Sequence, residues 1–195
     1  LLAYFEFNRN SIAEPSHLEA LGVPIMATLP SVQKLDKGYH LSQIFLEDVN
    51  SEFAESIRTL RTLLIARFKK QTSILMTSTY SGEGKTTIAL NTSLAFSKIG
   101  KVLLVETDIR RPSVLSVISK DETKRPGFSD LIQGSAKFSD TIVNIPGSQI
   151  DLLTSGSRRS DLTDLTTPAK LKEFFDELKK TYDYVILDTP PIQPV

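Results

Sequence analysis

A loop with two glycines, followed by a lysine and two threonines, is the stretch of this chain best suited to bind an anion. Gly82 and Gly84 let the backbone turn tightly and approach a ligand closely. The amides at the start of a following helix would face one concavity, to which the helix dipole adds positive charge. Lys85 could then reach the β- and γ-phosphates of a nucleotide, while the Thr86 hydroxyl binds Mg²⁺. The predicted phosphate-binding residues are Ser81, Gly82, Glu83, Gly84, Lys85, Thr86 and Thr87.

The surroundings of this loop have the layout of a P-loop, with one departure from the usual pattern. An apolar run at residues 74–76 is typical of a buried strand, and an amphipathic helical pattern follows the loop. Five residues before Gly84, the first glycine of the pattern is replaced by Thr79. Taken alone, the segment could also be an ordinary loop-to-helix junction with a threonine near the cap.

Carboxylates end two further apolar runs. Glu106 and Asp108 follow residues 102–105, and Asp188 follows residues 185–187. Ligands of open α/β sheets bind at the carboxyl ends of the strands, so these acids are expected beside the loop. Asp188 has the form of a Walker B aspartate, which holds Mg²⁺ directly or through water. Taken singly, Asp108 could instead cap a helix, and Asp188 could form a turn before the prolines that follow.

The same region supplies groups for proton transfer and for charge neutralisation. Glu106 or Asp108 could accept a proton from a hydroxyl or from water, if the nucleophile lies within about 3 Å. Arg110 or Arg111, which follow directly, could offset the charge that develops on a phosphoryl group. A surface or interface ion pair is the alternative role for either arginine.

Predicted strands and helices alternate along the chain, which indicates the α/β class with a P-loop NTPase-type, mainly parallel sheet and helices on both faces. One helix is expected from Asn50 or Ser51 to about residue 70. Its expected buried face consists of Phe53, Ile57, Leu60, Leu64 and Phe68. The pair Thr167–Pro168 predicts another helix start. We also expect a helix over 127–134 capped by Ser129, a strand over 149–154 and loop over 31–48.

Composition limits the class of protein. The 195 residues include 23 basic and 23 acidic side chains, and the absence of a basic block argues against a nucleic-acid partner. The chain contains no cysteine, which excludes disulfides and thiolate metal sites.

We expect an N-terminal juxtamembrane segment, residues 1–48, and a P-loop domain, residues 49–195, with a truncated C-terminal end. The apolar residues 1–5 could be a frayed terminus or the stub of a membrane helix.

Four motifs in order make the chain resemble the bacterial tyrosine kinases (BY-kinases), the Wzc-like enzymes of capsule and exopolysaccharide export. The P-loop is the first of the four. Residues 102–112 have the form of a Walker A′ motif, and residues 184–191 have the form of Walker B. Glu55, Arg58 and Arg61 match the E-x-x-R-x-x-R helix motif of that family. Residues 21–30 also resemble the segment that precedes the family's kinase domain.

This resemblance implies an ATP- and Mg²⁺-dependent protein-tyrosine kinase that autophosphorylates in trans and regulates polysaccharide polymerisation and export. Lys85 and Thr86 would bind ATP or ADP and Mg²⁺, with Asp108 and Asp188 as the Walker A′ and Walker B acids. The implied catalytic residues are Lys85, Glu106, Asp108 and Arg110, and the implied metal ligands are Thr86, Asp108 and Asp188. The family usually has aspartate at the position of Glu106.

The resemblance also implies partners and a location. Glu55, Arg58 and Arg61 would join subunits into a homo-oligomeric ring, which presents the tyrosine-bearing tail of one subunit to its neighbour. From the residues alone, these three could equally form a solvated helix face with a local ion pair. The export machinery and the cytoplasmic face of the inner membrane are the implied surroundings. The tyrosines of this chain are Tyr4, Tyr39, Tyr80, Tyr182 and Tyr184, without the family's C-terminal cluster.

Two other functions fit part of this pattern. A MinD- or ParA-like ATPase shares the sheet and the strand-end acids, but its signature lysine early in the P-loop is Tyr80 here. A non-catalytic, nucleotide-gated scaffold of polysaccharide assembly is compatible with Glu106 in place of the usual aspartate.

Overall fold

The computed structural model describes residues 20, 22, 24–30, 44–68, 72–118, 125–145, 147–157 and 166–193. Its helices are α3 (Ile44–Glu47), α4 (Glu52–Arg67), α5 (Lys85–Phe96), α6 (Val114–Ile118), α7 (Phe128–Gln133), the 3₁₀ helix η2 (Phe138–Asp140) and α9 (Pro168–Thr181). Its strands are β1 (Thr72–Met76), β2 (Val102–Glu106), β3 (Ile142–Asn144), β4 (Ile150–Leu153) and β5 (Tyr184–Asp188).

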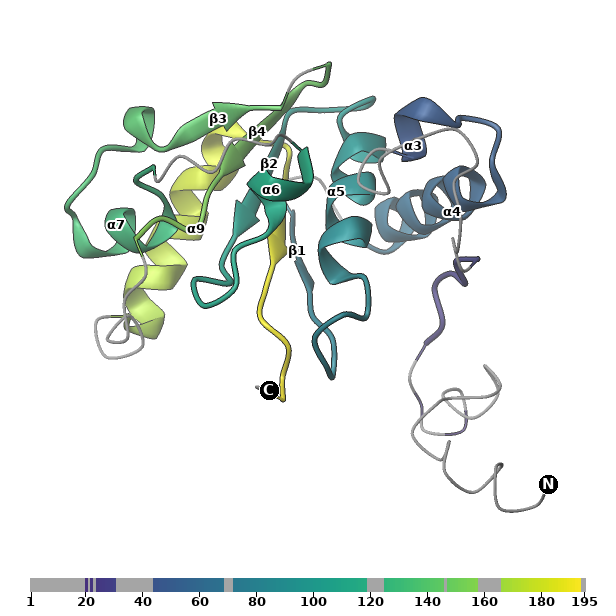
Figure 1. Ribbon diagram of the computed structural model, residues 1–195, viewed down its shortest axis with the longest axis horizontal. Coiled ribbons are helices and arrows are strands. Elements are labelled where there is room, and N and C mark those ends of the chain that lie inside the picture. The colour runs from purple at the N-terminus through teal and green to yellow at the C-terminus, as the bar shows by residue number, and fades with distance from the viewer. Residues whose placement is uncertain are drawn as a thin grey trace.

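The strands form one five-stranded sheet in the order β1-β5-β2-β4-β3, which confirms the predicted mainly parallel α/β fold. Strands β1, β5, β2 and β4 are parallel, and β3 alone pairs antiparallel with β4. Helices α3, α4 and α5 lie on one side of the sheet and α7 and α9 on the other (Figure 1). Because β1 lies at the edge of this sheet, Leu75 is 60% exposed.

Strand β2 shows why its sequence is a continuous apolar run. Alternate side chains of a strand point to opposite faces. Val102 and Leu104 therefore join the core that includes α4 and α5, while Leu103 and Val105 join the core that includes α9. A strand covered on both faces needs no polar position until its end, which is where Glu106 appears.

Local capping fixes two of the helices where the sequence predicted them. Ser51 caps α4, its hydroxyl accepting a hydrogen bond from the Ala54 amide at 3.2 Å. Thr167 caps α9 in the same way, and Pro168 occupies the first turn. Helix α7 differs from the prediction, because Gly127 rather than Ser129 is its cap.

Two sequence expectations for the α4 region were wrong. Phe68 does not belong to the buried face, since α4 ends at Arg67 and Phe68 is 46% exposed. Residues 44–47, expected as loop, form α3, whose Ile44 and Phe45 are buried. The Phe45 amide donates to Asn91 Oδ1 at 2.9 Å, so α5 holds this short helix in place.

The segment boundary at residue 48 remains a prediction. Ser16 and Glu19 match the capping-box pattern in the sequence, but they lie outside the described residues. Within the part of the chain that the structure describes, no helix has the length and apolar character needed to cross a bilayer.

Candidate nucleotide site

The predicted phosphate loop connects β1 to α5, with its glycines in the left-handed conformation. Gly82 has φ +89° and Gly84, the residue before α5, has φ +83°. A side chain at either position would meet no atom within 4 Å, so the backbone conformation itself requires glycine. Glu83 fastens the loop: its Oε2 accepts hydrogen bonds from the Thr79 amide at 2.9 Å and the Tyr80 amide at 3.2 Å.

The sheet register brings three strand ends to this loop. Met76 of β1 and Glu106 of β2 both pair with Asp188, the last residue of β5, which lies between these two strands. Thr107 strengthens this junction, because its amide donates to the Asp188 carbonyl at 2.9 Å and its hydroxyl donates at 3.1 Å. The first turn of α5 meets the same point, where Thr86 Oγ1 donates to Asp188 Oδ2 at 2.6 Å.

Asp188 is a buried carboxylate surrounded by charges of both signs, with a side chain only 2% exposed. Burial raises its pKa, and the nearby Glu106 and Asp108 carboxylates act in the same direction. The Thr86 hydrogen bond and the charge of Lys85 lower it in part. Its second oxygen, Oδ1, has no hydrogen-bond partner among the residues that the structure describes. A buried anionic oxygen without a donor is suited to a cation.

These groups fit a magnesium ion that is shared with a nucleotide. Mg²⁺ in such sites is bound through one or two carboxylates, retained waters and substrate phosphates rather than by an all-protein cage. The Thr86 hydroxyl and Asp188 supply the oxygen donors expected of the chain. In the described part of the chain, no group of three or more histidine or acidic side chains forms a separate metal cluster.

Asp108 lies just beyond β2, where it shapes the turn that carries the two arginines. Its Oδ1 accepts hydrogen bonds from the Arg110 amide at 3.2 Å and the Arg111 amide at 3.0 Å. Asp108 is half-buried, whereas both arginine side chains are exposed. The phosphate loop and the strand ends thus meet at the carboxyl ends of the parallel strands. They carry the predicted residues Lys85, Thr86, Asp108, Arg110 and Asp188.

Glu106 has partners that the sequence did not predict. Its Oε1 accepts hydrogen bonds from the amides of Ser113 at 2.6 Å and Val114 at 2.8 Å, and Oε2 accepts from the Ser155 amide at 3.2 Å. The side chain is 2% exposed. These contacts give no support to the predicted role of Glu106 as a proton acceptor, which remains a prediction.

Ser113 lies beside the candidate site, although the sequence did not predict it there. Its hydroxyl lies 3.1 Å from the Thr86 hydroxyl. The available signal was its position directly after the Arg110-Arg111-Pro112 run and directly before a helix, where serine is favoured as a cap.

The residues predicted for subunit contacts are partly used within the chain. Arg58 forms an ion pair with Glu55 at 2.8 Å and donates to the Val49 carbonyl at 2.8 Å. Arg61 instead reaches α5, where its Nη1 donates to the Ala95 carbonyl at 3.0 Å. The side chain of Glu55 is 69% exposed and that of Arg58 32% exposed. The predicted interface therefore stays a prediction, and Arg61 has an additional role inside the subunit.

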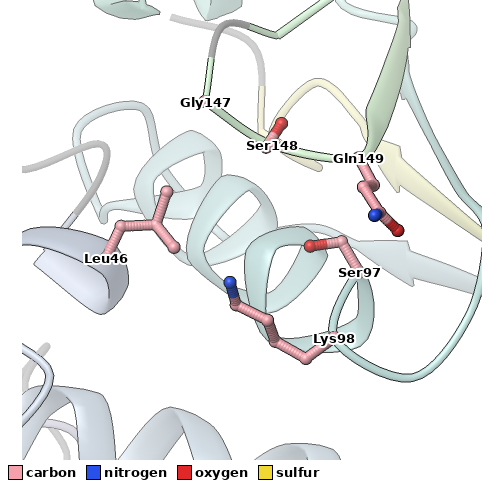
Figure 2. A pocket seen from close by; sticks show the side chains of 6 residues that line it. All are labelled: Leu46, Ser97, Lys98, Gly147, Ser148 and Gln149. Atoms are coloured by element: carbon pink, nitrogen blue, oxygen red, sulfur yellow. The ribbon is translucent and has the colours of Figure 1, made fainter.

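A polar cavity of about 420 Å³ lies at the opposite end of α5 from the phosphate loop. Figure 2 shows its lining, which joins α3, the end of α5 and the turn before β4. The lining residues are Leu46, Ser97, Lys98, Gly147, Ser148 and Gln149. None of the predicted site residues belongs to this cavity.

Comparison with known proteins places this geometry in a family. The model of the AAA domain family AAA_31 matches residues 71–195. The tyrosine-protein kinase YwqD of Bacillus subtilis is 32% identical, over 78% of this chain and 65% of its own length. CapB of Staphylococcus aureus is 28% identical, over 80% of this chain and 69% of its own length. The chain spans only 28% of the tyrosine-protein kinase Wzc of Salmonella typhi, to which it is 29% identical.

Several solved structures also superpose on this chain. The chimeric protein CapA2B2 superposes with a TM-score of 0.78 and 30% identity, over 94% of this chain and 77% of that one. MinD of Pyrococcus horikoshii superposes with a TM-score of 0.52 and 28% identity, over 63% of this chain and 50% of that one. MinD therefore shares the fold, but less of this chain superposes on it than on CapA2B2. By its motifs, its sheet and its relatives, the chain belongs to the bacterial tyrosine kinases, and residues 71–195 belong to the AAA domain family AAA_31.

Proposed function

We propose that this chain is the catalytic domain of a bacterial protein-tyrosine kinase, which transfers the γ-phosphoryl group of ATP to tyrosine hydroxyls. The convergence of Thr86 and Asp188 at 2.6 Å carries the proposal, because it joins the phosphate loop to the strand-end acids. A nucleotide triphosphate with its cation needs both parts within a few ångströms of each other.

The residues of the chain divide the work of phosphoryl transfer. The loop amides and Lys85 would hold the β- and γ-phosphates, and Thr86, Asp108 and Asp188 would hold Mg²⁺. When bound, the cation would neutralise charge that develops on the phosphate groups during transfer. The tyrosine oxygen forms the new bond to the γ-phosphorus, the bond from that phosphorus to the β-γ bridging oxygen breaks, and ADP leaves. Arg110, exposed at the same edge, would offset charge on the transferring group.

Asp108 is the better placed of the two predicted proton acceptors. It is half-buried at the strand end, and the structure records hydrogen bonds to its Oδ1. Glu106 is buried, and both of its oxygens accept backbone hydrogen bonds. In the proposed reaction, Asp108 takes the proton that the tyrosine hydroxyl releases.

The accepting tyrosine would come from another subunit or another protein. Among the tyrosines that the structure describes, Tyr182 and Tyr184 are 3% and 6% exposed, and Tyr80 is 41% exposed. We propose that a neighbouring subunit's tyrosine-bearing tail is the substrate, delivered by a ring that forms through Glu55, Arg58 and Arg61. Residues 1–48 would connect the domain, residues 49–195, to the cytoplasmic face of the inner membrane and to the polysaccharide export machinery, whose activity phosphorylation would regulate.

The decisive experiment incubates the chain with ATP, Mg²⁺ and a tyrosine-rich peptide, and measures intact mass and released phosphate. We expect phosphate on the peptide, and no transfer by the Asp108→Asn variant. Free phosphate without phosphotyrosine would favour the MinD-like ATPase. Nucleotide binding without turnover, unchanged in Asp108→Asn, would favour the scaffold.

A further inference from the structure

The Glu106 carboxylate connects three separate segments beneath the nucleotide site. It stands at the end of β2, accepts two amides at the start of α6 through Oε1, and accepts the amide that follows β4 through Oε2. The distances are 2.6, 2.8 and 3.2 Å. A buried carboxylate that accepts several backbone hydrogen bonds is a strong structural anchor, because hydrogen bonds to an anion are about twice as strong as neutral ones.

This arrangement is unsuited to accepting a substrate proton. A general base needs an oxygen within hydrogen-bond reach of the reacting hydroxyl. Both Glu106 oxygens instead face amides of the chain, in a position that is 2% exposed. Release of either oxygen would leave a buried amide without a partner, at a cost of about 1–3 kcal/mol.

The anchored segment carries a hydroxyl to the proposed magnesium side of the site. Because Glu106 fixes the Ser113 amide, the Ser113 side chain stands 3.1 Å from Thr86 Oγ1. The same Thr86 oxygen lies 2.6 Å from Asp188 Oδ2. A continuous series of contacts thus runs from Glu106 through Ser113 and Thr86 to Asp188.

We infer that Glu106 is a positioning residue, which holds the Ser113 hydroxyl against Thr86 and thereby orients the Thr86 oxygen for the nucleotide-bound cation. Ser113 is then a further residue of the site. Both assignments rest on the proposed nucleotide site, but neither depends on the identity of the phosphate acceptor. The length of glutamate matters, because aspartate is one methylene shorter and would not reach amides of both α6 and the segment after β4.

The test measures dissociation constants for ADP by calorimetry, with and without Mg²⁺, in six proteins. These are the parent chain, Glu106→Gln, Glu106→Asp, Ser113→Ala, the double variant of Glu106→Gln with Ser113→Ala, and the control Ser116→Ala. Ser116 lies on the same short helix, exposed, with its hydroxyl on the Ser113 carbonyl. Loss of an outer partner of a metal ligand weakens metal-dependent binding by about 10- to 100-fold, and this is the loss expected for Mg-ADP in both single variants.

Three further results are expected. Binding of ADP without Mg²⁺ changes much less than binding of Mg-ADP. The double variant binds Mg-ADP no more weakly than Glu106→Gln, because both changes act through one hydroxyl. Glu106→Asp does not restore the parent affinity, although it keeps the carboxylate.

Other outcomes overturn the inference. Unchanged Mg-ADP binding by Glu106→Gln together with lost phosphotransfer would make Glu106 a proton acceptor, as would full activity of Glu106→Asp. If Glu106→Gln does not fold, Ser113→Ala alone tests the inference, because this variant keeps the backbone amide that Glu106 binds. Unchanged binding of Mg-ADP by Ser113→Ala would then refute the role of Ser113. A parent chain that binds Mg-ADP but transfers no phosphate refutes the kinase proposal and leaves this inference standing.

Discussion

Thr86 and Asp188, which are 102 positions apart in the chain, are joined by a 2.6 Å hydrogen bond from Oγ1 to Oδ2. This contact links the start of α5 to the end of strand β5. It also leaves Asp188 Oδ1 buried without a partner in the described part of the chain. A buried carboxylate oxygen without a donor destabilises the fold, and a cation bound at this position would offset that cost.

The variant Asp188→Asn tests whether the Asp188 carboxylate destabilises the fold while it supports the binding of Mg-ADP. Burial raises the pKa of Asp188, which means that the fold disfavours its anionic form. The neutral amide is therefore expected to raise the Tm of the nucleotide-free protein, and to abolish the increase in Tm that Mg-ADP gives the parent. Thermal unfolding with and without ligand measures both effects. A lower Tm of the nucleotide-free variant would show that the carboxylate stabilises the fold.

Lys85→Met is expected to weaken nucleotide binding strongly and to remove phosphotransfer while the fold is retained. Hydrogen bonds to charged groups contribute about 1.5–3 kcal/mol, which corresponds to about a 10- to 100-fold loss of ATP affinity. Lys98→Met is the matched control, because Lys98 is an exposed lysine in the cavity at the other end of the same helix. Titration with a fluorescent ATP analogue compares the two variants. Equal affinities for both would place the phosphates elsewhere.

Arg61→Ala and Glu55→Ala separate the internal role of the α4 motif from its proposed role between subunits. Arg61 donates to the Ala95 carbonyl at 3.0 Å, so its loss is expected to lower the free energy of unfolding by about 1–3 kcal/mol. Glu55 is exposed, and its loss is expected to weaken assembly without a comparable loss of stability.

Chemical denaturation and light scattering measure these two effects, with Arg67→Ala in the last turn of α4 as control. The combined variant Arg58→Ala and Arg61→Ala should lack any higher oligomer that the parent forms. An oligomer that survives the double change would mean that α4 is not the contact helix.

Tyr182 is expected to make the stability of the fold fall at alkaline pH. Burial and the 2.8 Å hydrogen bond to Asp151 raise the pKa of its hydroxyl above the usual range. The unfolded chain therefore loses this proton first, at a pKa of about 10, so the contribution of Tyr182 is complete below that pH and is lost as pH rises further.

Tyr182→Phe should unfold more easily by about 1 kcal/mol at pH 8, because it lacks the hydrogen bond. Its free energy of unfolding should then fall less steeply than that of the parent above pH 10. Urea unfolding at a series of pH values measures both curves. Parallel curves would show that Tyr182 does not cause the fall in stability at alkaline pH.

The sequence predicted those parts of the structure that local patterns determine. Thr167 was predicted as a cap and Ser51 as one of two candidates, because such side chains can accept a bond from an amide three residues on. The structure shows this bond for both residues. The strand-end positions of Glu106 and Asp188 followed from apolar runs that a doubly covered sheet requires.

The features that the sequence did not predict depend on distant contacts. Helix α3 has only four residues, and its Phe45 amide is held by Asn91, 46 positions away. The partners of Glu106 likewise include Ser155, 49 positions away. Neither contact leaves a periodic signal, and a carboxylate at a strand end has the same appearance in the sequence whether it faces substrate or backbone amides.

Helix α5 meets the phosphate loop at its first residue and Arg61 near its last turn, at the Ala95 carbonyl. If assembly changes the position of Arg61, then nucleotide binding and subunit assembly both act on the same twelve-residue helix, α5. Thermodynamic linkage then demands reciprocity: the factor by which subunit contact tightens nucleotide binding equals the factor by which nucleotide tightens subunit contact.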